Sequence, residues 1–271
     1  MILQDFAHAT LGAGGPRVFR LGLSGTYRPG KPALHRALDA GVNYFFCYGF
    51  DGQTVGFLRG LSASSREKYV VATGAYNLIW TRQDLRRTLE KRLRQLQTDY
   101  IDVFLFLGVM KPKEFPEPVQ EELRRLKEDG RVRAVGMSCH NRKFAGGLVE
   151  RGALDVLMLR YNAAHRGAEQ DIFPRLAAFH PGVMSYTATR WSYLLRRPRG
   201  WPKDGRIPAA PMCYRFVLSN PQVDVCMMAP SNPKQLEENL AAIREGPLPE
   251  EEMQFMREFG DAVHQAQKWF M

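Results

Sequence analysis

Residues 98–141, TDYIDVFLFLGVMKPKEFPEPVQEELRRLKEDGRVRAVGMSCHN, decide the fold class of this 271-residue chain. The apolar run 101–106 predicts a buried strand, and the run 134–137 predicts a second one. Between them, residues 118–127 show the apolar spacing of an amphipathic helix, which Asp129-Gly130 ends. A strand, a helix and another strand in this order predict a parallel βαβ unit.

The same rhythm of strands and helices extends from this unit toward both ends of the chain. The eight predicted strands are residues 18–23, 42–46, 69–73, 101–106, 134–137, 156–159, 183–186 and 225–228. We therefore expect an α/β fold, a (β/α)8 TIM barrel with an N-terminal hairpin and an extra C-terminal helix. Such a barrel commonly takes about 250 residues, so residues 1–271 are predicted to form a single domain.

Charge is plentiful and predominantly positive. The formal net charge is +10 and the sequence pI is about 9.6, which would suit an acidic partner without choosing among nucleic acid, membrane surface and small anion. In the predicted helix from Leu85 to Leu96 the leucines recur at helical spacing, so Arg92 and the other basic residues are expected on a solvated face. No stretch approaches the roughly 20 apolar residues of a membrane helix.

Cysteine usage and the first residues bear on the compartment and on metals. The four cysteines are widely spaced and form no CxxC pair. The first residues show neither the basic start nor the apolar run of a secretory leader. We expect a reduced, cytoplasmic protein, a monomer or small homo-oligomer. The His, Cys and acidic residues lack metal-ligand spacing, so no metal site is predicted.

Several ordered strings resemble one enzyme family. They are LGAGGPRVFRLGLSGTY (11–27), ALDAGVNYF (37–45), TDYIDVFLF (98–106), GRVRAVGMSCHN (130–141) and PSNPKQLEENLAA (230–242). Together they are similar to the aldo-keto reductases and cover nearly the whole chain in family order. The resemblance implies a barrel that binds NAD(P)H, reduces a carbonyl, and places its site at the carboxyl ends of the strands.

The resemblance also implies that most of the family's catalytic groups are missing. The family uses a tyrosine as the acid, an aspartate and a lysine that tune its pKa, and a histidine that orients the carbonyl. The last three fall on Phe46, Gly74 and Leu107, and Tyr48 resembles the tyrosine, although two residues are deleted before it. Tyr48 is our candidate acid, with a packed aromatic at the rim as the alternative; ordinary carbonyl reduction is expected to be weak or absent.

The cofactor positions are better matched. Ser138 resembles the serine that binds the carboxamide, and Tyr186 the tyrosine that stacks on the nicotinamide. The positions near the adenosine end are Ser231, Gln235, Glu238 and Asn239. Gln235 stands where an arginine often meets a 2′-phosphate, so the resemblance implies NADP or NAD without choosing. For the adenosine-end residues, simple helix capping and a solvated first turn are the alternative.

Other polar residues follow predicted strands five to seven and could supply different chemistry. Arginines could clamp an anionic small molecule, with a histidine as an acid or base. The candidates are His140 for catalysis and Arg160, Asn162, His165, Arg190 and Trp191 for substrate binding, with Arg166 as a further clamp. The alternative is that Arg160 pairs with Glu169 or Asp155 and that the histidines lie on exposed loops.

Three hypotheses remain open at this stage. The first is a nicotinamide-binding oxidoreductase that acts on a polar or anionic small molecule. The second is an inactive barrel that serves as a cofactor sensor or scaffold, and the third is a cofactor-free lyase or isomerase, favoured if Met158 and Cys139 close the groove. The basic segment 194–207 is interpreted as a lid over the mouth. Nucleic acid is not expected as a partner. A thiolate nucleophile at Cys139, beside His140, is a further alternative.

Overall fold

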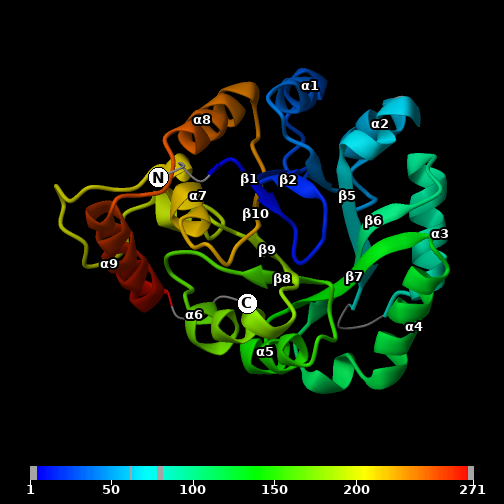
Figure 1. Cartoon of the computed structure of the whole chain (residues 1–271). Coiled ribbons are helices and arrows are strands. Elements are labelled where there is room, and N and C mark those ends of the chain that lie inside the picture. Colours follow the sequence, from blue (N-terminus) through cyan, green and yellow to red (C-terminus); the bar gives the residue numbers. More distant parts are fainter. Residues whose placement is uncertain (1–4, 62, 78–81, 268–271) are drawn as a thin grey trace.

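A computed structural model describes residues 5–61, 63–77 and 82–267. Eight parallel strands close into a barrel in the order β10-β3-β4-β5-β6-β7-β8-β9, and helices surround it (Figure 1). The barrel strands are β3 Leu21–Ser24, β4 Tyr44–Phe46, β5 Val70–Tyr76, β6 Ile101–Val109, β7 Val132–Cys139, β8 Val156–Arg160, β9 Gly182–Tyr186 and β10 Val225–Met228. The predicted (β/α)8 barrel is therefore confirmed.

The predicted N-terminal hairpin is also present, formed by β1 His8–Thr10 and β2 Arg17–Phe19. The first predicted strand, residues 18–23, is in fact divided between β2 and β3, because the chain turns from hairpin to barrel at Arg20. Leu11 and Val18 of this hairpin belong to the apolar cluster inside the barrel, so the hairpin plugs the amino-terminal end. Access to the interior is thereby left to the carboxyl ends of the strands.

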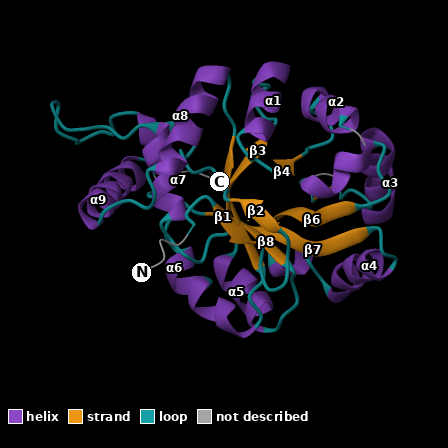
Figure 2. Cartoon of the chain, turned by 45° about the horizontal axis from the view of Figure 1, so that its top comes forward, coloured by secondary structure: helices purple, strands orange, loops and turns teal. Residues whose placement is uncertain are grey.

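Helices cover the outside of the sheet (Figure 2). They are α1 Lys31–Asp39, α2 Gly52–Gly60, α3 Leu85–Leu96, α4 Glu117–Glu128, α5 Arg142–Glu150, α6 Ala168–Asp171, α7 Ala210–Leu218, α8 Pro233–Arg244 and α9 Glu250–Ala266. Between β8 and β9 the chain forms the short α6 followed by a 3-10 turn, η3 Phe173–Ala178, in place of a longer α-helix. Pro174 has no N–H to continue an α-helix there. Among the described residues, no helix combines the length and apolar character that crossing a bilayer requires.

Side-chain alternation separates two cores. Inward residues such as Phe46, Leu105 and Met184 fill the barrel, whereas outward residues such as Phe45 and Phe104 pack beneath the helices. On β5 the inward set is Val70, Ala72, Gly74 and Tyr76, of which Val70 and Ala72 lie in the interior core and Tyr76 packs against it. This register determines which residues end at the mouth of the barrel.

Two expectations about basic residues need correction. Arg92 is 5% exposed rather than solvated, because it inserts under the loop after β4 and donates to the carbonyl of Tyr48. Segment 194–207 does not cover the mouth: Trp201 packs on Phe255 and Phe259, and the segment projects beside α9 (Figure 1). The segment is therefore packed against α9, and none of its residues is among those that line the mouth cavity.

Candidate active site

A cavity of about 510 Å³ opens at the carboxyl ends of the strands. Its walls are mostly aromatic, thioether and hydroxyl side chains. The lining residues are Ser24, Thr26, Tyr27, Phe46, Tyr48, Tyr76, Leu107, Gly108, Ser138, Met158, Tyr186, Thr187, Ala188, Thr189, Trp191, Tyr214, Met227 and Ala229. Among the residues that the structure describes, none that lines this cavity carries a formal charge, and the lining offers hydroxyl groups and rings.

The three positions that the resemblance left without catalytic groups surround the floor of this cavity. Phe46 and Leu107 are almost fully buried and line it. Gly74 pairs with Leu105 in the β5–β6 ladder, and a Cβ at Gly74 would overlap the carbonyl oxygen of Leu105. Because that neighbour is backbone, no side chain fits at position 74 without moving two strands. The absence of a lysine is thus built into the sheet.

Tyr48 lies at this cavity, and its phenol has a hydroxyl neighbour instead of a charged one. Thr26 donates to the Tyr48 hydroxyl at 3.2 Å, and Ser24 is 2.8 Å from Thr26. The ring packs edge-on against Phe46 and stacks on Phe50. As the Tyr48 oxygen accepts from Thr26, its own proton is available to an acceptor in the cavity.

Two buried charged residues, Asp51 and Arg92, hold the Tyr48 loop, and neither was predicted from the sequence to belong to the site. Asp51 is 3% exposed, accepts from the Tyr48 N–H at 3.0 Å, and caps α2 through Thr54 N–H. Arg92 donates to the Tyr48 carbonyl at 3.0 Å, and Gly49 has φ 82° beneath the guanidinium. Burial raises the pKa of Asp51, which these hydrogen bonds partly offset.

Ser138 and Tyr186 lie on the opposite wall of the cavity. Ser138 Oγ accepts from the Gly108 N–H at 2.8 Å, which orients the hydroxyl toward the mouth. Tyr186 has its hydroxyl 3.4 Å from His140 Nε2, and burial raises the pKa of Tyr186 to about 12. His140 itself is not among the residues that line the cavity, so it reaches the mouth through Tyr186.

A second cavity of about 510 Å³ continues the first toward the start of α8. The two share Tyr27, Thr189, Tyr214 and Ala229, and together they form one groove. At its far end lie Ser231, Gln235, Glu238 and Asn239. The structure thus brings the six predicted cofactor residues into one groove, with Ser138 and Tyr186 in its first part and these four in its second. Their roles toward a cofactor stay a prediction.

Local hydrogen bonds explain the geometry of that far end. Asn232 caps α8 by accepting from the Gln235 N–H, and Gln235 accepts from both the backbone and the hydroxyl of Ser231. Helix capping therefore accounts for Asn232, but the Ser231 and Gln235 side chains also face the groove. Capping and ligand binding are compatible here.

Two predicted substrate residues are placed elsewhere. Asn162 is fully buried, donates to the Thr187 carbonyl and accepts from the Ala164 N–H. Arg190 is also fully buried and donates to the carbonyls of Val263 and Gln267 at the end of α9. Both side chains therefore stabilise the loops around the mouth and do not reach its ligand space.

Trp191, in contrast, does lie over the cavity and is 61% exposed. The loop that carries it is conformationally unusual, because Thr187, Arg190, Trp191 and Ser192 all have positive φ. Such backbone costs free energy unless the surroundings enforce it. The anchored guanidinium of Arg190 provides that enforcement and so holds Trp191 in place.

The remaining predicted residues, His140, Arg160 and His165, form a basic cluster close to Tyr186. Burial and the nearby Arg160 lower the pKa of His140, and burial with neighbouring cations lowers that of His165 to about 3. The acids proposed as partners of Arg160 are engaged otherwise: Glu169 binds Tyr161 and Arg257, and Asp155 binds Lys127. Arg160 and His165 do not line the mouth cavity.

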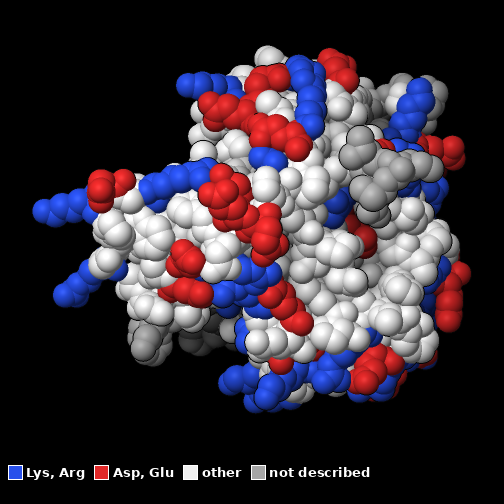
Figure 3. Space-filling view, turned by 60° about the vertical axis from the view of Figure 1, so that its left-hand side comes forward, with Lys and Arg blue, Asp and Glu red and all other residues white. Residues whose placement is uncertain are grey.

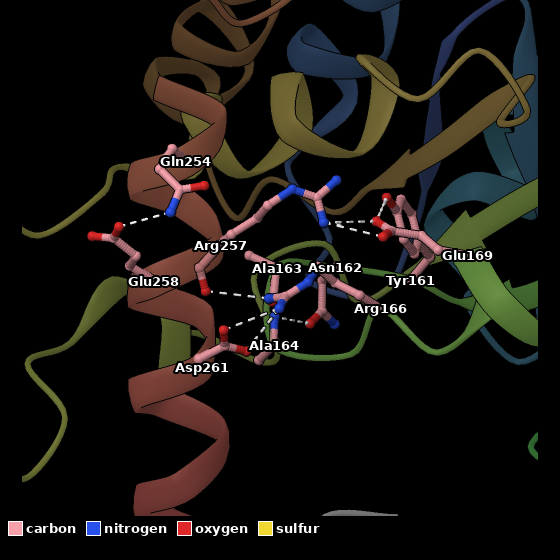
Figure 4. A network of polar contacts seen from close by, with 10 residues as sticks. All are labelled: Tyr161, Asn162, Ala163, Ala164, Arg166, Glu169, Gln254, Arg257, Glu258 and Asp261. Atoms are coloured by element: carbon pink, nitrogen blue, oxygen red, sulfur yellow. Dashed lines mark hydrogen bonds and ion pairs between the residues drawn. The ribbon is translucent and has the colours of Figure 1, made fainter. Parts of the chain in front are cut away.

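Arg166, a further candidate clamp, belongs to the attachment of α9 (Figure 4). It donates to both carboxylate oxygens of Asp261 and to the carbonyls of Ala163 and Arg257. The thiolate hypothesis for Cys139 fails on similar grounds, since the buried thiol donates to the Asn141 carbonyl and burial raises its pKa to about 11. Both residues support the fold of the mouth.

Surface charge gives no sign of a nucleic-acid interface on the face that carries α8 and α9. Figure 3 shows acidic and basic side chains interspersed there without one continuous basic patch. Several of these charges are paired, as in Arg206 with Glu252 and Lys234 with Glu238. On this face the charges are therefore interspersed and partly paired.

Comparison with known proteins identifies the family to which this barrel belongs. The family model described as "Aldo/keto reductase family" matches residues 11–197 and 194–261. The chain belongs to this family. Among curated relatives, L-galactose dehydrogenase of Arabidopsis thaliana is 24% identical over 249 residues, covering 78% of this chain and 77% of its own.

A second relative and a solved structure extend the comparison. The NADH-specific methylglyoxal reductase of Escherichia coli K12 is 22% identical over 270 residues, covering 80% of this chain and 82% of its own. The aldo-keto reductase AKR11C1 from Bacillus halodurans in its holo form superposes with a TM-score of 0.77 at 20% identity, covering 94% and 96% of the two chains. Its apo form gives 0.73 at 21% identity over the same shares. These similarities establish the fold and leave the substrate open.

Proposed function

We propose that this protein is a nicotinamide-dependent oxidoreductase that acts slowly on a small carbonyl compound or the corresponding alcohol. The observation that carries the proposal is the continuous groove from the neutral mouth to the start of α8. Ser138 and Tyr186 would hold the nicotinamide, and Ser231, Gln235, Glu238 and Asn239 the adenosine end. A bound nicotinamide supplies hydride to, or removes it from, the reacting carbon.

Tyr48 then supplies or accepts the proton at the carbonyl oxygen. The exposed Thr26 hydroxyl donates to the phenol oxygen, so the proton can be replaced from solvent through Thr26, and the buried Ser24 hydroxyl bonds Thr26 from the barrel side. Phe46, Gly74 and Leu107 leave this phenol without the charged neighbours that sharpen its acidity. We therefore expect turnover several orders of magnitude below that of a complete site.

Charge at the far end of the groove favours NAD(H) over NADP(H). Among the lining residues of this second cavity, Glu238 is the one with a formal charge, and it is negative. A 2′-phosphate there would meet a carboxylate without a lining cation, and like charges brought together lower affinity. Gln235 offers an amide that suits a ribose hydroxyl.

The observed groove bears on both alternatives. A cofactor-free lyase or isomerase would be favoured if Met158 and Cys139 closed the groove. Met158 lines the open mouth, and the Cys139 thiol donates to the Asn141 carbonyl, so neither side chain closes it. An inactive sensor shares the cofactor site and differs in chemistry alone. Tyr48→Phe distinguishes these two: a reductase loses about 100-fold or more in turnover, while cofactor affinity is unchanged.

The first experiment is a titration of the purified protein with NADH and with NADPH, followed by nicotinamide fluorescence. We expect NADH to bind at least about tenfold more tightly than NADPH. Glu238→Gln should reduce the ratio of NADH affinity to NADPH affinity. Glu237→Gln should leave this ratio unchanged, because Glu237 lies on the same helix but pairs with Arg36 and does not line the groove. Binding of neither dinucleotide would overturn the proposal.

A further inference from the structure

His140 directly follows β7, beyond the point where β6 and β7 leave their regular pairing. The register of the two strands shifts between Phe106 and Val109, and Gly108 within that stretch has φ 88°. After the shift, Cys139 pairs with Val109, and the His140 N–H donates to the Val109 carbonyl at 2.9 Å. A bulge of this kind redirects the side chains that follow it. The backbone of His140 is therefore fixed, although the strand has ended.

The side chain of His140 is directed at Tyr186. Its Nε2 lies 3.4 Å from the Tyr186 hydroxyl, and the two rings meet edge to face at 87°, with centroids 6.3 Å apart. Its Nδ1 is buried and has no hydrogen-bond partner in the part of the chain that the structure describes. The hydrogen bonding of this imidazole is thus concentrated on Nε2 and the phenol.

Tyr186 ends β9 and is one of the residues that line the mouth cavity. It pairs with Arg160 in the β8–β9 ladder, two residues after Met184 pairs with Met158. Its ring packs against the interior core of the barrel, and its hydroxyl meets His140 at the end of β7. A ring held both at its Cβ and at its hydroxyl keeps one orientation at the cavity wall.

The protonation states of the two groups favour this contact near neutral pH. Burial, with a further contribution from Arg160, lowers the pKa of His140, so its imidazole is uncharged. Burial raises the pKa of Tyr186 to about 12, so its phenol keeps its proton. A neutral imidazole and a phenol each have a donor and an acceptor, so they can bond in either direction.

We propose that His140 is a positioning residue, which holds the Tyr186 hydroxyl and thereby fixes the ring on which a nicotinamide stacks. The inference rests on the proposed function for the identity of the stacked ligand. A ring that is already oriented loses less entropy when a ligand binds, so losing the tether should weaken cofactor binding. His140 acts through Tyr186, since it is not among the described residues that line the cavity.

Two substitutions at position 140 separate the tether from the imidazole that provides it. In His140→Gln the side-chain amide stands close to the place of Nε2, so it still reaches the Tyr186 hydroxyl. In His140→Asn the amide stands close to the place of Nδ1, which has no partner, so the tether is lost. Both variants remove the imidazole ring, and a difference between them therefore reports the contact with Tyr186.

Fluorine NMR of protein labelled with 3-fluorotyrosine observes the Tyr186 ring without cofactor. The Tyr186 resonance is identified by its loss in Tyr186→Phe. We expect one narrow resonance in the wild type and in His140→Gln. In His140→Asn the resonance should broaden or split, because the untethered ring samples more than one orientation. Equal line shapes in His140→Gln and His140→Asn would overturn the inference, even where NADH binds.

Titration with NADH measures the consequence for binding. His140→Asn should weaken NADH binding about three- to tenfold, and His140→Gln should stay within about twofold of the wild type. Tyr186→Phe keeps the ring without its hydroxyl and should weaken binding to a similar degree. The double variant His140→Asn/Tyr186→Phe should bind no more weakly than Tyr186→Phe alone. Additive losses, or wild-type affinity of His140→Asn, would contradict the inference.

Tyr161→Phe is the matched control for loss of a phenol. Tyr161 is buried, its hydroxyl donates to Glu169 at 2.7 Å, and it is not among the described residues that line the cavity. This variant should lower the thermal midpoint and leave NADH affinity unchanged; an equal loss of affinity would show that the effect of Tyr186→Phe is not specific. Failure of the wild type to bind NADH would overturn the proposed function, and the fluorine spectra would still decide whether His140 positions Tyr186.

Discussion

The two ends of the groove differ in the chemistry they present. At the α8 end, Ser231, Gln235 and Glu238 offer polar groups on a helix start. At the mouth, Phe46 and Leu107 are apolar, and Gly74 has no room for a side chain. Binding groups at one end thus coexist with an altered reaction centre at the other. Under the proposed function, the barrel separates holding a ligand from transforming it, because different strand and helix ends build each part.

The largest expected effect comes from adding a side chain at position 74, which tests whether the sheet itself excludes a residue larger than glycine from the reaction centre. Gly74→Ala should lower the free energy of unfolding by about 2–3 kcal/mol, since its Cβ would press on the Leu105 carbonyl and separate β5 from β6. Gly74→Lys should cost more and should not restore rapid reduction. Urea unfolding followed by circular dichroism measures the loss.

Gly56→Ala is the control for this prediction. Gly56 lies in α2, and a Cβ there would meet open space, so alanine should stabilise by up to about 1 kcal/mol. If Gly74→Ala proves as stable as the wild type, the spacing of β5 and β6 is not what empties position 74.

Arg190→Met tests whether the rim arginines stabilise the fold or bind ligand. The variant leaves the Val263 and Gln267 carbonyls without their donor, so we expect a loss of about 2–3 kcal/mol in unfolding free energy. The ratio of affinities for methyl 4-acetylbenzoate and 4-acetylbenzoate, two ketones that share a ring and differ in charge, should not change. Selective loss of carboxylate binding would show instead that Arg190 serves the ligand.

Gln235→Arg sharpens the comparison from the α8 end. A guanidinium on the groove should raise affinity for NADPH about tenfold, equivalent to about 1.4 kcal/mol, with little change for NADH. Lys234→Arg is the control, because Lys234 neighbours Gln235 on α8 but does not line the groove. Equal effects of the two variants would contradict the placement of the adenosine end.

The last expected effect concerns pH. The folded-state pKa of His165 is about 3, below its usual 6.5, so the unfolded chain binds the proton more readily. Above pH 6.5 this imidazole is neutral in both states, so it does not lower the free energy of unfolding. As the pH falls from 6.5 toward 3, the unfolded chain takes up the proton and the free energy of unfolding decreases. Urea midpoints measured between pH 7 and 4 should therefore fall less steeply for His165→Gln than for the wild type. Parallel profiles would show that His165 does not contribute.

Local patterns were sufficient for the barrel and insufficient for parts of its mouth. The apolar runs located every barrel strand, but residues 69–73 stopped short of Tyr76. Alternation through Val70, Ala72 and Gly74 would have reached Tyr76, had glycine not interrupted the apolar signal. Arg92 was misplaced because helical spacing cannot show that a loop with Gly49 lies over the helix.

Polar residues at the strand ends show the limit most clearly. Arg160 and Asn162 were predicted to bind substrate, yet neither is among the residues that line the mouth, and Asn162 binds the Thr187 carbonyl instead. Arg190 was assigned to substrate, and its partners are carbonyls more than 70 residues later. Such partners cannot be found from a strand end alone.

The sequence by itself determined the closed α/β barrel, its eight strands and the family, because hydrophobic periodicity and ordered strings are local and repeat along the chain. Tertiary structure alone decided that the described lining of the mouth carries no formal charge, that Gly74 is held empty by the Leu105 carbonyl, and that Arg190 binds carbonyls of α9 instead of a ligand. These properties arise where β5 and β6 meet side by side and where α9 returns to the mouth. They depend on which distant atoms occupy the surrounding space, and residue order does not record that.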